Sequence, residues 1–418
     1  MRHVFPARWK TQKLNQLGFV GRGRSRHRPR NEPSLYGGEY PFFQTGDIKA
    51  ANLYLTEYSQ TYNEKGLAQS KQWEPGTLCI TIAANIADTA ILGIRGCFPD
   101  SVIGFISDPA KADVHFIKYY IDLIKLDMQQ VSHGTTQDNL SLDKLLRFEF
   151  VAPDVEEQRK IAAVLSAYDD LIENNLRRIK ILDEMAQNLY REWFVKFRFP
   201  GHQQARFIDS SLCPIPEGWE VRELSKFFDF ERGVEPGSKN YASKLAENYV
   251  PFLRVGDLGK RTSNLFIDKS FAKGRMLAPN DIAITMDGTV GLVSMGLTGA
   301  YSSGIRRVVP KTNCTIGNTF VFLLLQSEHI QSIIESHAKG TTIKHASSSI
   351  GHMIFVLPDK ALTDTFEEHA EPLNSHTLSL GRRNDTLRRT RDLLLPKLIS
   401  GEVDVSELDI AVPEDATC

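Results

Sequence analysis

The sequence contains few cysteines and no long apolar segment. Its five cysteines are scattered over 418 residues, and none belongs to a Cys-x-x-Cys pair. A disulfide framework and a zinc site of the usual spacing are therefore not predicted, and a reducing cytoplasm is the expected location. The longest apolar run, residues 320–325, is far shorter than a membrane span, and no apolar stretch follows the basic N-terminus as in a secretory signal. We expect no association with a membrane.

Motifs for catalysis are also missing. The sequence has no Gly-x-x-x-x-Gly-Lys-Ser/Thr loop for nucleotide phosphates, no Asn/Asp-Pro-Pro-Tyr/Phe methyltransferase tetrapeptide and no His-Glu-x-x-His zinc motif. Pro99 and Asp100 could begin a nuclease motif, but no Asp/Glu-x-Lys follows at short range. A self-contained nuclease or methyltransferase is therefore disfavoured. We predict no catalytic residue, metal or cofactor in this chain, so any chemistry would take place on a partner chain.

Charge is unevenly distributed along a chain whose net charge is only -1. Residues 1–31 contain nine lysines or arginines and no acid, whereas residues 402–418 contain six acids and no base. The glycine-containing segment around Arg22, Arg24 and Arg26 could bring guanidinium groups to DNA phosphates. The alternative is that this basic segment is an arm surrounded by solvent, and composition alone does not decide between the two.

The sequence repeats itself once. The segment YPFFQTGDI at residues 40–48 returns 210 residues later as VPFLRVGDL at residues 250–258. Three further segments recur in the same order: WEPGTLCITI as LAPNDIAITM, HGTT as KGTT, and FEFVAP as IFVLP. A charged segment with helical periodicity follows each final proline. Because the period is far too long for a solenoid repeat, we predict two copies of one domain, each followed by a helix.

The charged segments are predicted to form two long helices. The first has an apolar seam at alternating spacings of four and three, with Asn175 as its one polar position: Ile161, Leu165, Tyr168, Ile172, Asn175, Ile179, Leu182, Ala186, Leu189 and Trp193. A helix over this segment would be about 50 Å long. The second has apolar residues at spacings of seven: Phe366, Leu373, Leu380, Leu387 and Leu394.

Such a stripe could belong to a helix that merely covers its own domain. Two stripes that follow equivalent domains favour a different arrangement, in which the helices pair as an antiparallel coiled coil with pseudo-twofold symmetry. Pro372 and Gly381 would weaken the second helix near its start, and Pro396 would end or kink it.

Inside each copy, the pattern predicts a mixed α and β domain, so the fold class is α+β. Strands are expected at residues 78–82, 102–106, 148–151, 282–286 and 354–357. Helices are expected at residues 116–128 and 319–334, the second with Asn318 as its N-cap. Polar and glycine-rich loops connect these elements, as is typical of a recognition domain.

The two copies resemble the specificity subunits of type I restriction-modification systems. The resemblance rests on PF-x-x-x-GD followed by Ile or Leu in both copies, on CFPDSVIG at residues 97–104, on GTTQ at residues 134–137 and on PDVEEQRKIA at residues 153–162. It covers nearly the whole chain. It is looser in the second half, where FEEHA at residues 366–370 departs from the Glu-Gln pattern that opens the first helix.

This resemblance implies a non-catalytic subunit that binds double-stranded DNA. Each of two target recognition domains would recognise one half of an asymmetric, bipartite site, and the helices would set the gap and dock two methyltransferase subunits. S-adenosylmethionine, ATP and Mg would be bound by partner subunits, which include motor-nuclease subunits. The expected boundaries are 1–152 and 201–358 for the recognition domains, 153–200 and 359–405 for the spacer helices, and 406–418 for an acidic tail.

Candidate site residues follow from this organisation. For DNA contacts we predict Arg22, Arg24, Arg26, Gln44, Gln137, Arg254, Arg306, Arg307 and Lys344. Gln44, Gln137 and Arg254 are the predicted base contacts, because they lie on the repeated Gly-Asp and Gly-Thr-Thr segments where side chains differ between the copies. For partner contacts we predict Leu165, Ile172, Ile179, Leu373, Leu380 and Leu387. The alternative function is a protein-binding scaffold whose loops bind protein instead of DNA.

Overall fold

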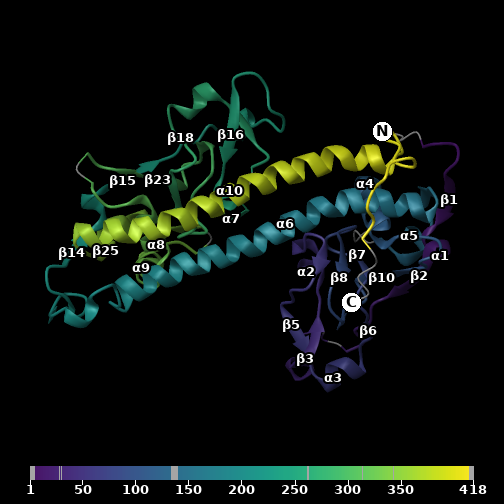
Figure 1. The fold of residues 1–418 in the computed structure, drawn as a ribbon, viewed down its shortest axis with the longest axis horizontal. Coiled ribbons are helices and arrows are strands. Elements are labelled where there is room, and N and C mark those ends of the chain that lie inside the picture. The colour runs from purple at the N-terminus through teal and green to yellow at the C-terminus, as the bar shows by residue number, and fades with distance from the viewer. Residues whose placement is uncertain are drawn as a thin grey trace. The chain divides into compact units, whose positions relative to one another are not determined.

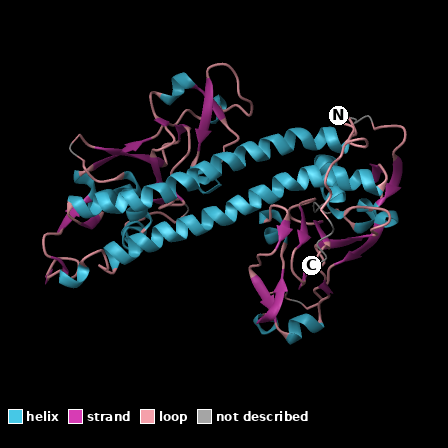
Figure 2. Cartoon of the chain, viewed as in Figure 1, coloured by secondary structure: helices cyan, strands magenta, loops and turns pink. Residues whose placement is uncertain are grey.

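The computed structural model describes residues 5–27, 29, 31–132, 140–260, 263–312, 314–341 and 343–413. The chain forms two compact units: unit 1 comprises Met1–Leu176 and Arg382–Cys418, and unit 2 comprises Arg177–Gly381. Each unit contains both strands and helices (Figure 2), which confirms the predicted α+β class. None of the helices in the described ranges is long and apolar enough to cross a lipid bilayer.

Unit 1 contains two larger sheets and one strand pair. The five-stranded sheet has the order β2-β10-β7-β8-β4, formed by Gly18–Arg22, Val102–Ser107, Leu78–Thr81, Thr89–Leu92 and Tyr54–Leu55. The four-stranded sheet has the order β5-β3-β9-β6, formed by Gln60–Tyr62, Tyr36–Phe42, Gly96–Cys97 and Gln72–Trp73. The pair consists of β1 (Lys10–Lys13) and β11 (Glu149–Ala152). The shorter helices are α1 (Leu14–Leu17), α2 (Thr45–Ala50), α3 (Glu64–Ala68), α4 (Val114–Ser132) and α5 (Leu142–Leu145).

Unit 2 repeats this plan. One four-stranded sheet has the order β15-β23-β19-β21, formed by Phe228–Arg232, Ile305–Pro310, Ile282–Thr285 and Val293–Ser294. The other has the order β17-β16-β22-β18, formed by Phe266–Asp268, Tyr249–Leu253, Gly299–Tyr301 and Met276–Leu277. The strand pairs are β14 (Glu220–Glu223) with β25 (Ile354–Leu357), β12 (Phe207–Ile208) with β13 (Ile215–Pro216), and β20 (Asp287–Gly288) with β24 (Lys344–His345). The shorter helices are α7 (Val255–Lys260), α8 (Asn318–Gln326) and α9 (Glu328–Ser336).

The two units share one strand order. The order β2-β10-β7-β8 of unit 1 corresponds to β15-β23-β19-β21 of unit 2, and β5-β3-β9-β6 corresponds to β17-β16-β22-β18. In both units the strand before the Gly-Asp segment pairs in parallel with its neighbour, with Phe42 opposite Cys97 and Phe252 opposite Ala300. The structure thus confirms the two similar domains that the sequence repeat predicts.

The predicted strands lie in the cores of these units. All four residues of β7 and all four of β19 are buried, which explains why their sequences are continuous apolar runs and not alternating patterns. The strands predicted at 102–106, 148–151 and 354–357 are also found, as β10, β11 and β25, within one or two residues of the expected bounds.

Two long helices, α6 (Val155–Tyr190) and α10 (Lys360–Ile399), contribute to both units (Figure 1). In unit 1, Asp169 of α6 contacts Arg391 of α10, and Asn175 Nδ2 donates to Asn384 Oδ1 at 2.8 Å. Because the residue numbers rise along one helix and fall along the other, the helices run antiparallel. Asn175 is buried in this seam, as expected of a polar register position, but its polar partner Asn384 was not predicted.

The same antiparallel pairing occurs in unit 2. Thr377 Oγ1 donates to Asp183 Oδ1 at 3.1 Å, and the rings of Trp193 and Phe366 lie 5.8 Å apart. Trp193 belongs to a π-helical segment, Arg191–Val195, that directly follows α6. These contacts confirm the predicted antiparallel pairing of the long helices.

Three details of the predicted helices are wrong. The single helix expected at 319–334 is divided into α8 and α9 at Ser327, whose backbone is extended and whose Oγ accepts from Ile330 N at the start of α9. A serine that caps a new helix competes with continuation of the old one. Asn318 is not the N-cap: Gly317 has that position, and Asn318 Nδ2 donates instead to Asn280 O at 2.8 Å. Finally, Pro396 does not end α10.

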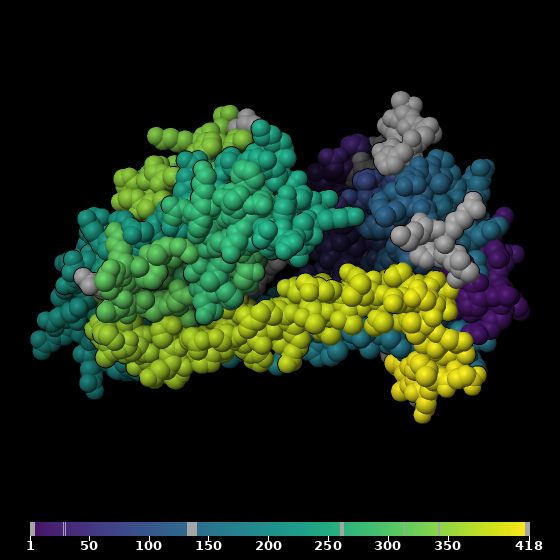
Figure 3. All heavy atoms as spheres, turned by 90° about the horizontal axis from the view of Figure 1, so that it is seen from above, coloured from purple at the N-terminus to yellow at the C-terminus, as the bar shows by residue number. Residues whose placement is uncertain are grey.

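The last turn of α10 and the segment after it pack onto the N-terminal segment of unit 1, as Figure 3 shows where yellow and purple atoms meet. Leu398 and Ile399 are buried in the core of this unit. The helix ends at Ile399, shortly before Gly401, which adopts a positive φ of 73°. Arg8 from the basic segment pairs with Asp404 of the acidic segment at 3.0 Å, so part of the charge asymmetry is satisfied inside the chain.

Candidate nucleic-acid interface

The repeated Gly-Asp segment forms the same local structure in both units. In unit 1, the backbone N–H of Gln44 donates to Asp47 Oδ2 at 2.7 Å at the start of α2. In unit 2, the backbone N–H of Arg254 donates to Asp257 Oδ2 at 2.8 Å at the start of α7. The aspartate is the third residue of each helix. Its carboxylate accepts from the backbone N–H of the residue that precedes the helix, as in a capping box. This explains the repeated aspartate and leaves Gln44 and Arg254 exposed at equivalent positions.

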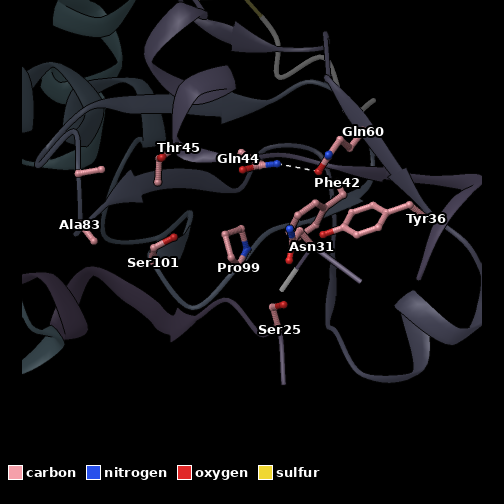
Figure 4. A pocket seen from close by; sticks show the side chains of 11 residues that line it. Ser25, Asn31, Tyr36, Phe42, Gln44, Thr45, Gln60, Ala83, Pro99 and Ser101 are labelled. Atoms are coloured by element: carbon pink, nitrogen blue, oxygen red, sulfur yellow. Dashed lines mark hydrogen bonds between the residues drawn. The ribbon is translucent and has the colours of Figure 1, made fainter. Parts of the chain in front are cut away.

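A cavity of about 290 Å³ lies beside Gln44 in unit 1. Its lining combines polar and aromatic side chains from β3, β5, the start of α2 and three loops: Ser25, Asn31, Tyr36, Phe42, Gln44, Thr45, Gln60, Ala83, Ala84, Pro99 and Ser101. Gln44 Nε2 donates to Gln60 Oε1 at 2.7 Å, and Figure 4 shows this amide pair on one side of the cavity, with Pro99 and Ser25 on the other. A cavity with amides and hydroxyls around apolar rings can accept a planar polar ligand.

The basic segment forms the wall of this cavity at Ser25. Arg24 is half-buried, and its Nε and Nη2 both donate to Ser70 O, while Ser70 Oγ donates to Arg24 O at 2.7 Å. The backbone N–H groups of Arg26 and His27 both donate to Gln69 Oε1. The side chains of Gln69 and Ser70 thus hold the backbone of this loop in one conformation.

This arrangement distinguishes the three predicted arginines of unit 1. Arg24 already uses part of its guanidinium within the fold, so only its remaining N–H groups could contact DNA without loss of the bonds to Ser70 O. Arg26 is exposed, and its guanidinium has no partner among the described residues. Arg22 is exposed at the end of β2, with its Nε donating to Asp100 O. Of the three arginines of this loop that the structure describes, Arg22 and Arg26 are therefore the ones exposed to solvent.

The predicted cations of unit 2 are all engaged by protein groups. Arg306 is only 7% exposed on β23, and its Nη2 donates to Ser347 Oγ at 2.8 Å. Burial lowers the pKa of Arg306, whereas the nearby Asp287 carboxylate raises it. Alternation along β23 puts Arg306 on the same face of the strand as Val308, which is buried in the core of unit 2.

The neighbouring cations are more accessible. Arg307 pairs with Glu231 at 3.0 Å and lies 3.5 Å from Asp281. Lys344 on β24 pairs with Glu335 and is about half exposed. Each would have to exchange an acidic partner for a phosphate before it could bind DNA. Gln137 lies outside the described residues, so its predicted role stays a prediction.

The residues predicted to bind partner subunits belong to the seam within the chain. Leu165 and Ile172 in unit 1 are fully buried, and Leu380 in unit 2 is 2% exposed. Ile179, Leu373 and Leu387 are half-buried. The most exposed apolar side chains of α6 are Leu171 in unit 1 and Ile181 and Met185 in unit 2, each at least 50% exposed, and none of them belongs to the predicted seam. Heptad spacing identifies the seam of the paired helices but not these exposed positions.

Two residues of this site were not predicted from the sequence. Gln60 and Gln69 belong to no repeated segment, and each is distant in sequence from the residue that it contacts. The register that places Gln60 opposite Phe42 in the β3–β5 pair brings it to Gln44, and only the strand pairing reveals this. In the described part of the chain, no three His, Cys, Asp or Glu side chains cluster as metal ligands.

Comparisons with known proteins agree on one family. The family model described as "Type I restriction modification DNA specificity domain" matches residues 6–182 and 216–359, well over half of the chain. The type I restriction enzyme MjaIX specificity subunit of Methanocaldococcus jannaschii is 26% identical over 96% of this chain and 95% of its own length. The type I restriction enzyme HindI specificity subunit of Haemophilus influenzae is 22% identical over 65% of this chain and 72% of its own length.

A solved structure supports the fold. The crystal structure of the type I restriction-modification system S subunit from M. genitalium has a TM-score of 0.58 at 16% sequence identity. The match covers 93% of this chain and 96% of that structure. The likeness therefore extends over both units and both long helices.

Proposed function

Because this chain belongs to the type I restriction modification DNA specificity family, we propose that each of its units recognises one half of an asymmetric, bipartite DNA sequence. The observation that supports this most directly is the shared Gly-Asp structure, which presents the amide of Gln44 in unit 1 and the guanidinium of Arg254 in unit 2. Amide and guanidinium groups select different base edges in the major groove. Two units with one backbone plan and different exposed side chains can therefore recognise two different sequences.

In this proposal the chain itself is not catalytic. It binds double-stranded DNA in the cytoplasm and assembles with two methyltransferase subunits, which would bind S-adenosylmethionine, and with motor-nuclease subunits, which would bind ATP and Mg. The residues of the chain serve to select the sequence. Phosphate contacts from cations such as Arg22 and Arg26 would fix the position of unit 1 on the duplex without specifying bases.

We further propose that the paired helices set the gap between the two half-sites. Helix α6 is continuous over 36 residues, and its residues belong to both units. At ~1.5 Å per residue its length is about 54 Å, which exceeds one turn of B-DNA, ~34 Å. For docking of the methyltransferase subunits, the exposed side chains of Leu171, Ile181 and Met185 are better candidates than the buried seam.

The test uses the chain in complex with its methyltransferase subunit. A mobility-shift assay over a salt series compares a duplex that contains the methylated motif with a scrambled duplex. We expect the motif duplex to bind at least 10³ times more tightly, as is typical of specific DNA binding. Arg26→Ala should weaken binding to both duplexes and reduce the slope of log K against log salt by about one, because one phosphate contact is lost.

Arg147, an exposed arginine between α5 and β11, provides the matched control, and Arg147→Ala should leave the slope unchanged. Equal binding to both duplexes would refute sequence recognition. A complex that binds no DNA but captures a protein through its loops would instead support the scaffold alternative, which the family match does not favour.

A further inference from the structure

We infer that Gln44 and Gln60 together recognise the major-groove edge of one adenine in the half-site of unit 1. Gln44 would contact the base and Gln60 would orient the amide of Gln44. This inference rests on the proposed function and deepens it, because it names a base and the two side chains that select it. It is drawn from the position of the pair, from the hydrogen bonds that the pair leaves unused, and from the comparison with unit 2.

The position of the pair is fixed by the fold. Asp47 Oδ2 accepts from the backbone N–H of Gln44 at 2.7 Å and from Ser59 Oγ at 3.3 Å, so one carboxylate joins the start of α2 to the residue before β5. Pairing of Phe42 with Gln60 sets the register of β5 beside β3. The two amides therefore meet because of backbone structure, and not because two flexible surface side chains happen to approach.

The pair also lies where a base could approach. Both glutamines are exposed, and both line the 290 Å³ cavity. Figure 4 shows the amides near Thr45, with Pro99 and Ser101 across the cavity from them. The loop of Arg22 and Arg26 adjoins this cavity through Ser25, so phosphate contacts and a base contact could be made on one face of the unit.

The unused hydrogen-bonding groups of Gln44 match adenine. A primary amide has two N–H donors and one carbonyl acceptor, and Gln44 gives one donor to Gln60 Oε1. Its second N–H has no partner among the described residues, and its carbonyl oxygen keeps a free lone pair even where it accepts from the backbone N–H of Asp47 in the capping box of α2. A donor next to an acceptor is complementary to adenine, which presents N7 as an acceptor and N6 as a donor in the major groove.

Exchange of the amide oxygen and nitrogen does not change this conclusion. If the bond is reversed, so that Gln60 Nε2 donates to Gln44 Oε1, Gln44 keeps both N–H donors and the second lone pair of its oxygen. Gln44 still presents one donor and one acceptor. Guanine offers two acceptors at this edge and would place O6 against the carbonyl oxygen of Gln44, so it is disfavoured.

Unit 2 provides an independent comparison at the same structural position. Arg254 replaces Gln44 on the same capping structure, and its guanidinium is 55% exposed and 3.7 Å from Asp257. A guanidinium has only donors and is suited to the two acceptors of guanine. The residue three positions before the repeated aspartate therefore varies in the chemistry that distinguishes purines, while the aspartate that holds its backbone N–H is the same in both units.

The experiment measures the methylated motif in cells that contain the full chain and its methyltransferase subunit. The variants are Gln44→Ala, Gln44→Arg, Gln60→Ala and Gln60→Glu, and the matched control is Gln130→Ala, an exposed glutamine on α4 of the same unit. Binding of each complex to duplexes with all four bases at each position of the motif gives the discrimination. Thermal unfolding of each variant confirms that the fold is retained.

We expect Gln44→Ala to relax a single adenine position in one half-site, with a loss of discrimination of roughly 5- to 150-fold at that position. Gln44→Arg should favour guanine there. Gln60→Ala should relax the same position, whereas Gln60→Glu, which keeps an acceptor for Gln44, should retain adenine. The other half-site and the Gln130→Ala motif should be unchanged.

The result that overturns the inference is an unchanged first half-site in Gln44→Ala, or relaxation at a position that is not adenine. A loss of discrimination in Gln60→Glu equal to that in Gln60→Ala would also contradict the role of Gln60. Failure of the proposed function looks different: the unaltered chain itself would then give no bipartite motif.

Discussion

The buried ion pair between α6 and α10 in unit 1 should contribute measurably to the stability of the chain. Asp169 is fully buried, and it accepts from the Tyr119 hydroxyl at 2.6 Å while it pairs with Arg391, whose side chain is 17% exposed. Burial alone would lower the pKa of Arg391, but the carboxylates of Asp169 and Asp392 outweigh it and raise that pKa. When Asp169 is replaced by alanine, Arg391 still stays charged, because a guanidinium keeps its proton in proteins and Asp392 remains in contact with it.

The cost of Asp169→Ala follows from this geometry. Removal of one partner from a buried ion pair costs ~3–5 kcal/mol, because the other charge stays buried without compensation. Asp392, which contacts the Arg391 guanidinium at 2.8 Å from an exposed position, reduces this penalty, so we expect a value near the lower limit of ~3 kcal/mol. For a unit of this size, such a loss lowers Tm by roughly 6–12 °C.

Calorimetry of the full chain measures this effect, and the matched control is Asp385→Ala. Asp385 pairs with Arg388 of the same helix at 3.6 Å, and both side chains are solvent-exposed, so its removal should change the free energy of unfolding by no more than ~0.5 kcal/mol. A double-mutant cycle with Arg391→Ala isolates the pairwise energy. If Asp169→Ala and Asp385→Ala destabilise unit 1 equally, the ion pair is not what joins the helices there.

Two further predictions concern the long helices. Burial raises the pKa of Glu367, whose carboxylate accepts from Phe320 N at 2.7 Å in unit 2. Above the ordinary glutamate pKa of 4.5, the folded state therefore binds more protons than the unfolded state. The contribution of Glu367 to stability consequently falls as pH rises. Glu367→Gln should accordingly raise Tm at pH 8 but not at pH 4, and equal effects at both pH values would contradict the assignment. Ile172→Pro, at a fully buried position in α6, should cost at least ~3 kcal/mol and abolish methylation of the bipartite site; a methylation pattern unchanged from the parent chain would rule out α6 as the element that sets the gap.

The overall arrangement of the fold could be predicted because the sequence contains two copies of the same domain. Buried strands such as β7 and β19 are apolar runs between turn residues, and the seam of α6 and α10 has a heptad pattern, so local spacing suffices to find them. The starts of the two long helices nevertheless correspond, because Asp154 Oδ1 accepts from Glu157 N and Asp359 Oδ1 accepts from Leu362 N. Counted from these caps, Glu367 lies one turn after the position of Gln158, yet both side chains accept from a backbone N–H: Gln158 from Asp113 and Glu367 from Phe320.

The candidate site was less predictable because its contacts are long-range. The repeated Gly-Asp segment identified Gln44 and Arg254, but nothing in the sequence near Gln44 pointed to Gln60. Arg24 and Arg306 were predicted as DNA contacts from their charge alone. In the structure their guanidinium groups donate to backbone carbonyls and, for Arg306, to a serine hydroxyl. Charge patterns do not show which arginines form hydrogen bonds within the chain, because those bonds depend on carbonyl groups that strand pairing brings close.

We propose above that the two units recognise independent halves of one DNA site. The most direct measurement replaces residues 201–358 with the equivalent segment of a relative that has a different specificity and then determines the methylated motif in cells that supply the methyltransferase subunit. We expect one half of the motif to change to that of the relative, while the other half is retained. A motif in which both halves change, or in which neither does, would contradict this proposal.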